Sequence, residues 1–381
     1  MRSKRLLILI GICLTVVLIG SLSIAGCAKP APTPAPTPTP AAEAEWTLTY
    51  DAFHPPGLYV SKAGMYFMEL VEERSGGRVK FDSYFGGALS SSTELLGTVR
   101  SGGSDVSQIV VNYFPGEMPL AQCTSLGFIS LHQWAWAKAI TEFYSTYEPA
   151  VQEFANYNIK ILYTCPGGHN TLWSSKPVPN ADALKGMKVR AFKYSAKAME
   201  WLGATPVSID WSDSYVALQQ GTIDGWWDNP FAIGWTAKCY EVGPYVVETG
   251  CGCYGSQTTV IREDLFNELP SDIQKIVLDS AAEAGDRAYQ IQSETGIAAV
   301  DDMVANDLAE PNIWSDAEIA KAQAMVQPGL TEYWVEQTEA DYPELDAKAA
   351  VEKFYELVHK YEKVQPHKTP FEYWEEKLAE K

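Results

Sequence analysis

The sequence predicts an α/β protein of two lobes, each a mixed, mostly parallel sheet flanked by helices, with a long helix bracing both lobes. Three observations support this fold class. Strand-like segments alternate with segments that have apolar residues at helical spacing, an order typical of parallel sheets covered by helices. The chain beyond residue 45 is long enough for two lobes with their own cores. Residues 263–301 are helical in pattern almost throughout, and a run this long suggests a helix that braces both lobes.

The first lobe is expected to open with a strand at 46–50, where apolar and polar residues alternate. A helix at 59–74 follows, and the next glycine pair ends it. The alternation then continues with a strand from residue 78, a short helix at 94–100, a strand at 105–111, a longer helix at 134–157 and a strand at 159–164. Ligands on such sheets bind beyond the carboxyl ends of the strands. Asn112-Tyr113-Phe114 and Phe53-His54 lie at such ends.

The chain is expected to cross into a second lobe at 165–168 and to return through strands at 242–249 and 257–261. The long helix starts near Pro270, and the tail from residue 347 has amphipathic helical segments. Lobe I is predicted to contain residues 46–166 and, after the chain returns, residues 256–296 with the bracing helix. Lobe II is predicted at 167–255, and C-terminal helices at 297–381 are expected to complete lobe II and pack on the body.

The N-terminus predicts export. Three basic residues in the first five positions precede an apolar run at 6–24, as in a secretory signal peptide. Small residues stand directly before Cys27, so the segment resembles a bacterial lipoprotein signal, in which 1–26 is removed and Cys27 is acylated. A transmembrane helix is the alternative, since the run could span a bilayer. The Pro/Ala/Thr-rich linker at 27–45 has no stop-transfer charge cluster, which favours a lipid anchor on the periplasmic or cell-surface side.

The net charge of the protein limits the kinds of molecule that it can bind. The formal net charge is −19, which disfavours nucleic-acid binding because a basic surface is the electrostatic signature of that function. An acidic body also repels anions at long range, so an anionic ligand needs a positive side chain inside its own site.

The cysteines give little information on the redox state of the protein. Five cysteines follow Cys27, an odd number, and the pair at 251 and 253 is too close for an ordinary disulfide. We expect them to be small buried hydrophobic residues. A single disulfide in an exported protein is the alternative.

The strongest candidate site joins an arginine to an aromatic loop. Arg190 follows the apolar residues of a short strand, and its guanidinium matches a carboxylate with two parallel hydrogen bonds. A surface arginine paired with an acid is the simpler alternative, but the strand-end position favours ligand binding. The complementary loop is Trp226-Trp227-Asp228-Asn229-Pro230, in which Asn229 offers both a donor and an acceptor.

Aromatic residues at strand ends are candidate walls for this site. Adjacent tryptophans in a strand point to opposite faces, so we expect one of Trp226 and Trp227 to line the cleft and the other to pack in the core. Core packing is the simpler role for each aromatic residue taken alone. The further candidates are Trp173, Phe192, Trp211, Tyr113 and Phe53.

Signals for catalysis are weak. The five histidines are scattered without metal-ligand spacing, and the chain has no Gly-x-Ser-x-Gly motif. The glycines at 250, 252 and 255 match the spacing of a dinucleotide-binding motif, but a strand-like segment follows where that motif needs a helix. We therefore expect neither an enzyme nor a cofactor.

Several short motifs, in a shared order, resemble the DctP-type solute-binding proteins of tripartite ATP-independent periplasmic (TRAP) transporters. They are Gly76-Gly77-Arg78-Val79, Arg100-Ser101-Gly102-Gly103-Ser104-Asp105, Leu184-Lys185-Gly186-Met187-Lys188-Val189-Arg190, the Tyr215 to Gly225 segment with Ala217-Leu218-Gln219-Gln220-Gly221, and Leu269-Pro270. The resemblance implies two lobes that close on an organic acid, with Arg190 gripping the carboxylate and Asn229 helping to hold it. It also implies delivery to membrane permease subunits.

Departures from the family pattern suggest the ligand. Residues 226–228 make the loop longer and more aromatic than in relatives, and 169–173 lack the second arginine that some relatives use. A monocarboxylate with an apolar or aromatic body is therefore favoured over a dicarboxylate or sialic acid. Certain relatives bind the acid with a metal ion through an acidic residue of this loop, so Asp228 is a candidate metal ligand. We expect a monomer. The alternatives are a sensory lipoprotein that reports to a receptor and an exported hydrolase acting on carboxylates.

Overall fold

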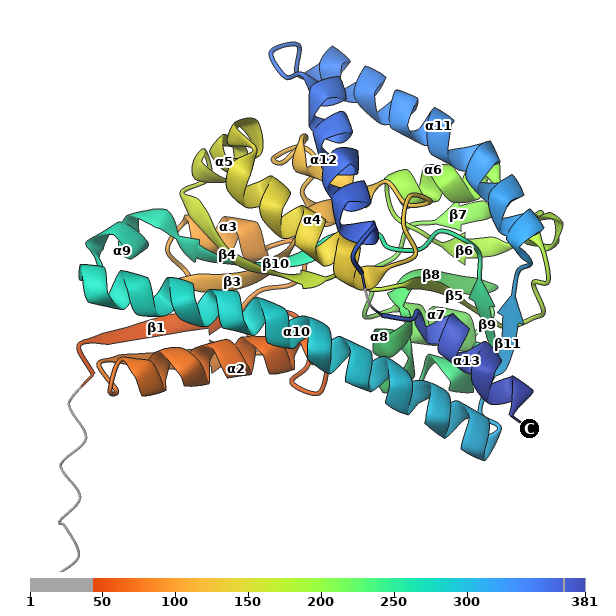
Figure 1. Cartoon of the computed structure of the whole chain (residues 1–381), viewed down its shortest axis with the longest axis horizontal. Coiled ribbons are helices and arrows are strands. Elements are labelled where there is room, and N and C mark those ends of the chain that lie inside the picture. The colour runs from red at the N-terminus through yellow and green to blue at the C-terminus, as the bar shows by residue number, and fades with distance from the viewer. Residues whose placement is uncertain (1–43, 366, 381) are drawn as a thin grey trace, which may run out of the picture. The chain divides into compact units, whose positions relative to one another are not determined.

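The computed structural model describes residues 44–365 and 367–380. The predicted signal peptide, Cys27 and the linker up to residue 43 lie outside the described residues. Figure 1 shows helices packed around two sheets, which confirms the predicted fold class. Among the described residues, no helix is both long and apolar enough to cross a bilayer.

The first sheet contains five strands in the order β2-β1-β3-β10-β4. β1 runs parallel to β2 and β3, whereas β10 is antiparallel to β3 and β4. The strands are β1 (Trp46–Asp51), β2 (Val79–Tyr84), β3 (Val106–Val110), β4 (Ile159–Pro166) and β10 (Ser256–Arg262). Val260 and Ile261, adjacent in β10, belong to separate cores, as the alternation of side chains along a strand requires.

Helices cover both faces of this sheet. Side chains of α2 and α10 share one core with Ile261, and those of α3, α4 and α5 share the other with Val260. These helices are α2 (Tyr59–Arg74), α3 (Leu95–Arg100), α4 (Gln133–Thr146), α5 (Glu148–Ala155) and α10 (Ser271–Asn306), and α9 (Glu263–Glu268) follows β10. Short 3-10 helices occur at Val111–Tyr113, Ala121–Ser125, Ala181–Leu184 and Cys239–Glu241.

The second sheet contains six strands in the order β11-β9-β5-β8-β6-β7. β8, β6 and β7 are parallel to one another, and β5 is antiparallel to both of its neighbours. The strands are β5 (Asn170–Ser174), β6 (Lys188–Arg190), β7 (Thr205–Val207), β8 (Gly225–Pro230), β9 (Tyr245–Glu248) and β11 (Glu310–Ile313). The remaining helices are α6 (Tyr194–Trp201), α7 (Ser214–Gln219), α8 (Phe231–Thr236), α11 (Asp316–Asp341), α12 (Ala347–Glu362) and α13 (Pro370–Ala379).

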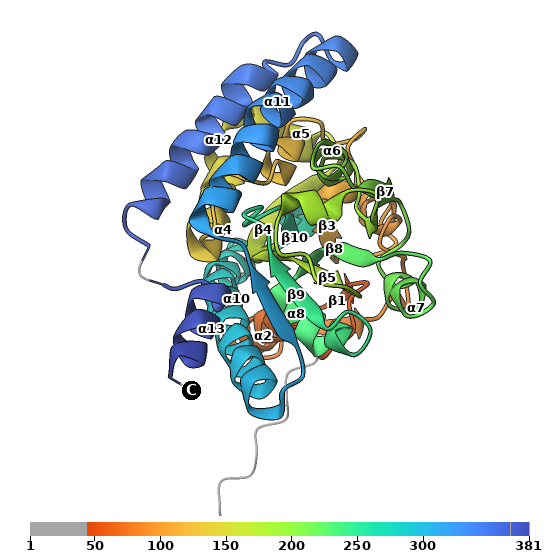
Figure 2. The ribbon, with the colours of Figure 1, turned by 90° about the vertical axis from the view of Figure 1, so that its right-hand side faces the viewer.

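The chain crosses between the sheets three times, from β4 to β5, from β9 to β10 and, through α10, from β10 to β11. An isolated bridge joins His169 to Cys253 where the first two crossings meet. The 36-residue helix α10 packs on α2 and β4 at one end and on α8 and α13 at the other. It therefore braces both sheets (Figure 1). Figure 2 shows α11 and α12 side by side, and α12 also packs on α4.

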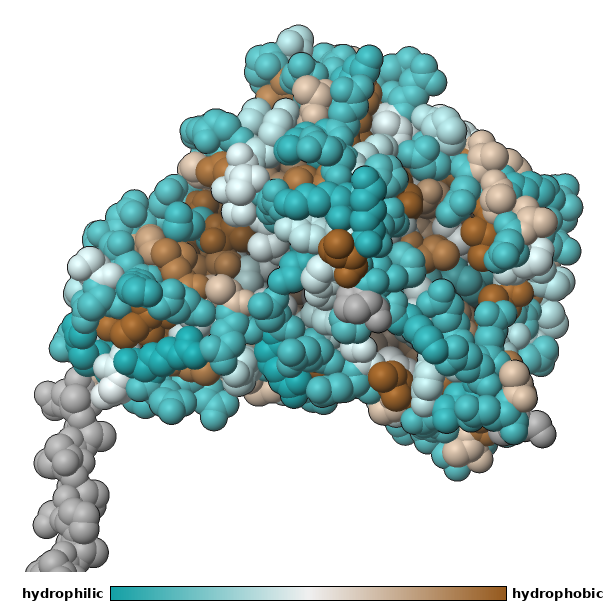
Figure 3. All heavy atoms as spheres, viewed as in Figure 1, coloured by the Kyte–Doolittle hydropathy of each residue, from teal (hydrophilic) through white to brown (hydrophobic). Residues whose placement is uncertain are grey.

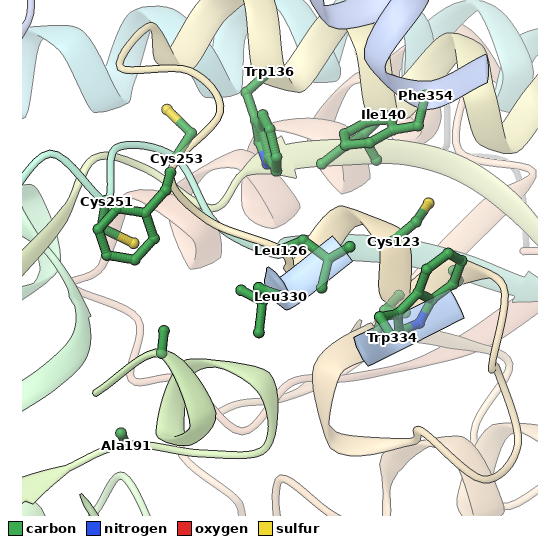
Figure 4. Close-up of a cluster of buried hydrophobic side chains, with 14 of the residues drawn as sticks. Cys123, Leu126, Trp136, Ile140, Ala191, Cys251, Cys253, Leu330, Trp334 and Phe354 are labelled. Atoms are coloured by element: carbon green, nitrogen blue, oxygen red, sulfur yellow. The ribbon is translucent and has the colours of Figure 1, made fainter. Parts of the chain in front are cut away.

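The aromatic core between α4 and α12 is well filled. Trp136 and Ile140 of α4 lie beside Phe354 of α12, with the Trp136 and Phe354 rings 4.9 Å apart and edge to face (Figure 4). The five cysteines after Cys27 are all buried and free, which confirms the expected small hydrophobic role. On the face seen in Figure 3, hydrophilic residues prevail and hydrophobic ones form small separate groups.

Two expected elements differ in the structure. The helix predicted at 134–157 is broken at Tyr147, because Pro149 lacks an N–H and its ring would clash with a carbonyl one turn earlier. The run at 263–301 is likewise two helices, α9 and α10, and the predicted start of the long helix near Pro270 is confirmed. β11 was not expected, and α11 lies within the C-terminal helices expected at 297–381, although its bounds were not predicted. α11 buries a single narrow row of residues four apart, namely Ala322, Val326, Leu330, Trp334 and Thr338, and has Pro328 within it, so its sequence pattern is weak.

Candidate ligand-binding site

A cavity lies where strands of both sheets end. Its lining includes Val110 at the end of β3, Gln257 at the start of β10, Arg190 at the end of β6 and Asp228 in β8. The volume of this cavity is about 60 Å³. One water molecule needs roughly 10–15 Å³ on the same measure, so the cavity can hold several waters. The carboxyl ends of parallel strands are where open α/β sheets bind ligands, so this cavity is the candidate site.

Arg190 is the buried cation of this cavity. As the last residue of β6, it is held between β7 and β8, and it is only 2% exposed. Its Nε donates to the carbonyl of Ile209 at 3.2 Å, and its Nη1 lies 3.5 Å from Asp228 Oδ2. A buried guanidinium is costly unless it is paired, and one long ion pair leaves much of its donor capacity available to a bound anion.

Asp228 faces Arg190 from a strained position. Its φ is +58°, a left-handed conformation that aspartate and asparagine tolerate better than most residues. Oδ2 accepts hydrogen bonds from the Phe192 N–H at 2.8 Å and from the Ser195 hydroxyl at 2.6 Å. Burial raises the pKa of Asp228, and Arg190 is the main influence that opposes this rise.

Aromatic rings form a connected wall around the cavity. The ring of Phe53 lies 3.8 Å from that of His54 and 6.2 Å from that of Tyr113. The Tyr113 ring in turn meets Phe192 edge to face at 5.5 Å, and His54 meets Trp211 at 5.9 Å. Burial lowers the pKa of His54 to about 3, so this ring is neutral at physiological pH. The charged groups of the lining are therefore Arg190 and Asp228.

Six of the predicted site residues line this cavity together. They are Phe53, Tyr113, Arg190, Phe192, Trp211 and Asp228. Trp226 and Trp227 do not line it. Because β8 has helices on both faces, Trp226 packs in the core with Trp173, while Trp227 stacks on Phe128 in the opposite core. The prediction that one of these two tryptophans lines the cleft is therefore wrong for this cavity.

Trp173 and Asn229 also lie behind the lining. Trp173 is fully buried, and its Nε1 donates to the Asn229 carbonyl at 3.4 Å. The Asn229 amide donates to Cys239 Sγ at 3.1 Å, and its Oδ1 accepts from Trp211 Nε1 at 3.3 Å. Asn229 therefore positions a ring of the wall and lies outside the lining itself.

The sequence interpretation missed polar residues that line the cavity. Asn112 lies in the segment 112–114 that the sequence places at a strand end, but it was not among the predicted site residues. Tyr254 lies in a crossing, and Asn170 and Gln257 stand at the starts of β5 and β10, where strand periodicity gives little indication of which way a side chain points. Among the described residues, no group of three or more His, Cys, Asp or Glu side chains is arranged to hold a metal ion, and Asp228 offers the cavity a single carboxylate.

A larger cavity, of about 330 Å³, lies between the start of α4, the middle of α10 and the segment that leads into α13. Its lining includes His132, His169 and Gln292 but neither Arg190 nor Asp228. The convergence of strand ends and a buried ion pair identifies the smaller cavity as the better candidate.

Comparisons with known proteins agree with this geometry. The family model for bacterial extracellular solute-binding protein family 7, DctP, matches residues 53–337. A solute-binding protein from Sulfitobacter is 28% identical over 282 residues, which cover 71% of this chain and 81% of that protein.

Solved structures have the same fold. A TRAP periplasmic solute-binding protein from Desulfovibrio salexigens, in an open complex with the C-terminus of a symmetry mate in its ligand-binding site, superposes with a TM-score of 0.70 at 27% identity. The match covers 85% of this chain and 99% of that one. A TRAP solute-binding protein from Rhodoferax ferrireducens, in complex with copurified benzoate, superposes with a TM-score of 0.74 at 23% identity. This match covers 84% of this chain and 99% of that one. The chain described here therefore belongs to the DctP family of bacterial extracellular solute-binding proteins, the binding proteins of TRAP transporters.

Proposed function

We propose that this protein captures a small monocarboxylate with an apolar or aromatic body and delivers it to a TRAP membrane permease. The observation that carries the proposal is Arg190, a buried guanidinium at a strand end whose ion pair with Asp228 is long, at 3.5 Å. A carboxylate in the cavity would take the remaining donors, and its charge would offset the cost of burying the cation.

The wall of the cavity suits the rest of such a ligand. The connected rings of Phe53, Tyr113, Phe192 and Trp211 offer apolar faces and edges to a flat body. The lining supplies one cation for one carboxylate, which disfavours a dicarboxylate. The Rhodoferax protein with this fold holds benzoate. That complex illustrates what the fold accommodates, whereas the ligand class proposed here rests on the residues of this chain.

Capture and delivery require the site to open and close. The crossings between the sheets provide a hinge, and closure over the acid excludes water and strengthens the contact with Arg190. A ligand stabilises the closed state only through its preference for that state. In this proposal the protein is exported, anchored to the membrane by lipid on Cys27, and binds its ligand without converting it.

The test is binding by Arg190→Gln. We expect this variant to remain folded, because Asp228 keeps its hydrogen bonds from Phe192 and Ser195. Calorimetry with an acid found by a thermal-shift screen, or with one that copurifies, should show binding weakened by roughly 2–5 kcal/mol. Arg287→Gln is the matched control, since Arg287 pairs with Glu294 on the exposed face of α10 and its loss should leave affinity unchanged. A folded Arg190→Gln protein with wild-type affinity would contradict the proposal.

A further inference from the structure

The two oxygens of the Asp228 carboxylate have different environments. Oδ2 accepts from Phe192 and Ser195, at 2.8 and 2.6 Å. Oδ1 is buried and has no hydrogen-bond partner among the described residues, and the whole side chain is only 6% exposed. A buried carboxylate oxygen without a donor is expensive, so Oδ1 needs a donor in the cavity, a role that water fills in the empty site and that a ligand group can take over.

A second unpaired group lies beside it. The Asn170 side chain is buried, and its Nδ2 has no partner among the residues described. Its Oδ1 accepts the N–H groups of Thr171 and Asn229, each at 3.0 Å, so the orientation of the amide is fixed and Nδ2 is the free donor. Asn170 helps to lower the pKa of Asp228, so its amide donor faces that carboxylate, but Nδ2 and Oδ1 do not approach closely enough for a direct hydrogen bond, and both residues line the cavity.

An unpaired acceptor beside an unpaired donor suits a hydroxyl group. A hydroxyl donates one hydrogen bond and accepts others, so a single hydroxyl can satisfy Asp228 Oδ1 and Asn170 Nδ2 together. An ammonium group would satisfy only the acceptor, and a metal ion would be repelled by the amide donor. Arg190 Nη1 lies 3.5 Å from Asp228 Oδ2. A hydroxyl bound to Asp228 therefore lies close to a carboxylate bound to Arg190, which places both groups near each other on the ligand.

We propose that the ligand is a 2-hydroxy acid, whose carboxylate binds Arg190 and whose hydroxyl bridges Asp228 and Asn170. This inference rests on the proposed function, because it assumes that Arg190 holds a carboxylate. It adds that Asp228 and Asn170 select among monocarboxylates. An acid without the hydroxyl leaves both buried groups unpaired, and sites built to bind a hydroxyl reject such analogues strongly.

The experiment compares acids that differ only at that carbon. Calorimetry with mandelate, phenylacetate and 2-methoxy-2-phenylacetate, and with lactate and propanoate, tests one aromatic and one small body. Within the set that binds, the hydroxy acid should bind at least tenfold more tightly than the unsubstituted acid. The methoxy acid should lose this gain because it cannot donate to Asp228. The preference should persist in EDTA, and its loss there would mean that a cation occupies Oδ1, which would overturn the proposal.

Asp228→Asn is the matched variant, because asparagine tolerates the positive φ at this position. Its amide oxygen can keep the bonds from Phe192 and Ser195, which places its NH2 where Oδ1 stood, against the Asn170 donor. The preference for the hydroxy acid should then fall at least tenfold while the unsubstituted acid still binds. If the variant does not fold, the wild-type comparison decides alone.

The outcomes separate the two proposals. Equal affinity of the wild-type protein for hydroxylated and unsubstituted acids would overturn the 2-hydroxy inference and leave capture of a monocarboxylate standing. An unchanged preference in folded Asp228→Asn would also overturn it. Failure of every acid to bind, or wild-type affinity in Arg190→Gln, would contradict the proposed function itself.

Discussion

Two groups of buried polar side chains in this protein differ in how well they are satisfied. At the crossings between the sheets, His169 Nδ1 donates to the Leu131 carbonyl at 3.2 Å, and Nε2 is hydrogen-bonded to Glu248 Oε2. Glu248 Oε1 accepts from the Gly250 N–H at 2.7 Å, so every polar atom of the pair has a partner. In the cavity, by contrast, polar atoms without partners among the described residues include His54 Nδ1, Asn112 Oδ1, Asn170 Nδ2, Asp228 Oδ1 and Gln257 Oε1.

The difference separates structure from binding. An unmade buried hydrogen bond costs about 1–3 kcal/mol, so the polar atoms of the cavity need water or a ligand as their partner, whereas the crossing pair is satisfied within the protein. Proteins tolerate such costs mainly at functional sites. Removal of a paired group should therefore reduce stability, whereas removal of an unpaired group should reduce ligand binding.

The largest expected effect comes from breaking the pair at the crossings. His169→Ala leaves Glu248 buried without its partner and opens a cavity beside Phe371, so unfolding in urea should show a loss of roughly 3–5 kcal/mol. His359→Ala is the control, because His359 is exposed on α12 and its loss should change stability by less than about 0.5 kcal/mol. Equal stability of the two variants would show that the crossing pair is not a structural element.

The sequence predicted the framework of the site better than its polar content. Arg190 could be placed because a short apolar strand ends on it, and strand ends are where α/β sheets bind ligands. The polar side chains proposed to select the ligand could not be placed from the sequence. Asn170 belongs to a strand that is antiparallel to both neighbours and follows a crossing, so only tertiary structure brings it to Asp228.

The tryptophans show a second limit. Strand alternation predicted that Trp226 and Trp227 point to opposite faces, which the structure has. The sequence could not reveal that both faces of β8 are covered, so neither ring lines the cavity. The positive φ of Asp228, which sets the direction of its carboxylate, likewise has no signal in composition or periodicity.

A second prediction concerns pH and the same crossing pair. Burial raises the pKa of Glu248 from 4.5 to about 8, and burial lowers that of His169 from 6.5 to about 4. The glutamate contribution to stability is full below pH 4.5 and is lost as the pH rises through about 8. The histidine contribution is present above pH 6.5 and is lost as the pH falls through about 4. The pair therefore stabilises the fold most between pH 4.5 and 6.5.

Glu248→Gln should change this profile without disrupting the fold. The glutamine NH2 can donate to His169 Nε2, and its oxygen can accept from Gly250, so the geometry is preserved. In the wild-type protein the pair should lose on the order of 2 kcal/mol between pH 6.5 and 8. The variant should be flat over this window and should weaken below pH 6.5, as its neutral histidine resists protonation. Urea unfolding from pH 5 to 8.5 measures both. Glu294→Gln, on the exposed face of α10, should keep the wild-type profile, and an alkaline loss in Glu248→Gln would contradict the assignment.

The smallest change in stability should come from the cavity. Gln257 lines the site from β10, and its Oε1 has no hydrogen-bond partner among the described residues. Gln257→Met keeps the length of the side chain and removes that unpaired oxygen. Stability of the unliganded protein should stay the same or rise by up to about 1 kcal/mol, because replacement of an unpaired polar group by an apolar one is neutral or favourable. Affinity for the ligand should nevertheless fall.

Gln122→Met tests a buried glutamine whose amide nitrogen is paired, although its Oε1, like that of Gln257, has no hydrogen-bond partner among the described residues. Gln122 is buried away from the cavity, and its amide donates to the carbonyls of Val111 and Met118 at 2.8 and 3.2 Å. Its replacement leaves both carbonyls without this donor, so urea unfolding should show a loss of about 1–3 kcal/mol while calorimetry shows unchanged affinity. The two glutamines are thus expected to change different quantities. A stability loss in Gln257→Met equal to that in Gln122→Met would mean that the unpaired atoms of the cavity are structural rather than reserved for a ligand.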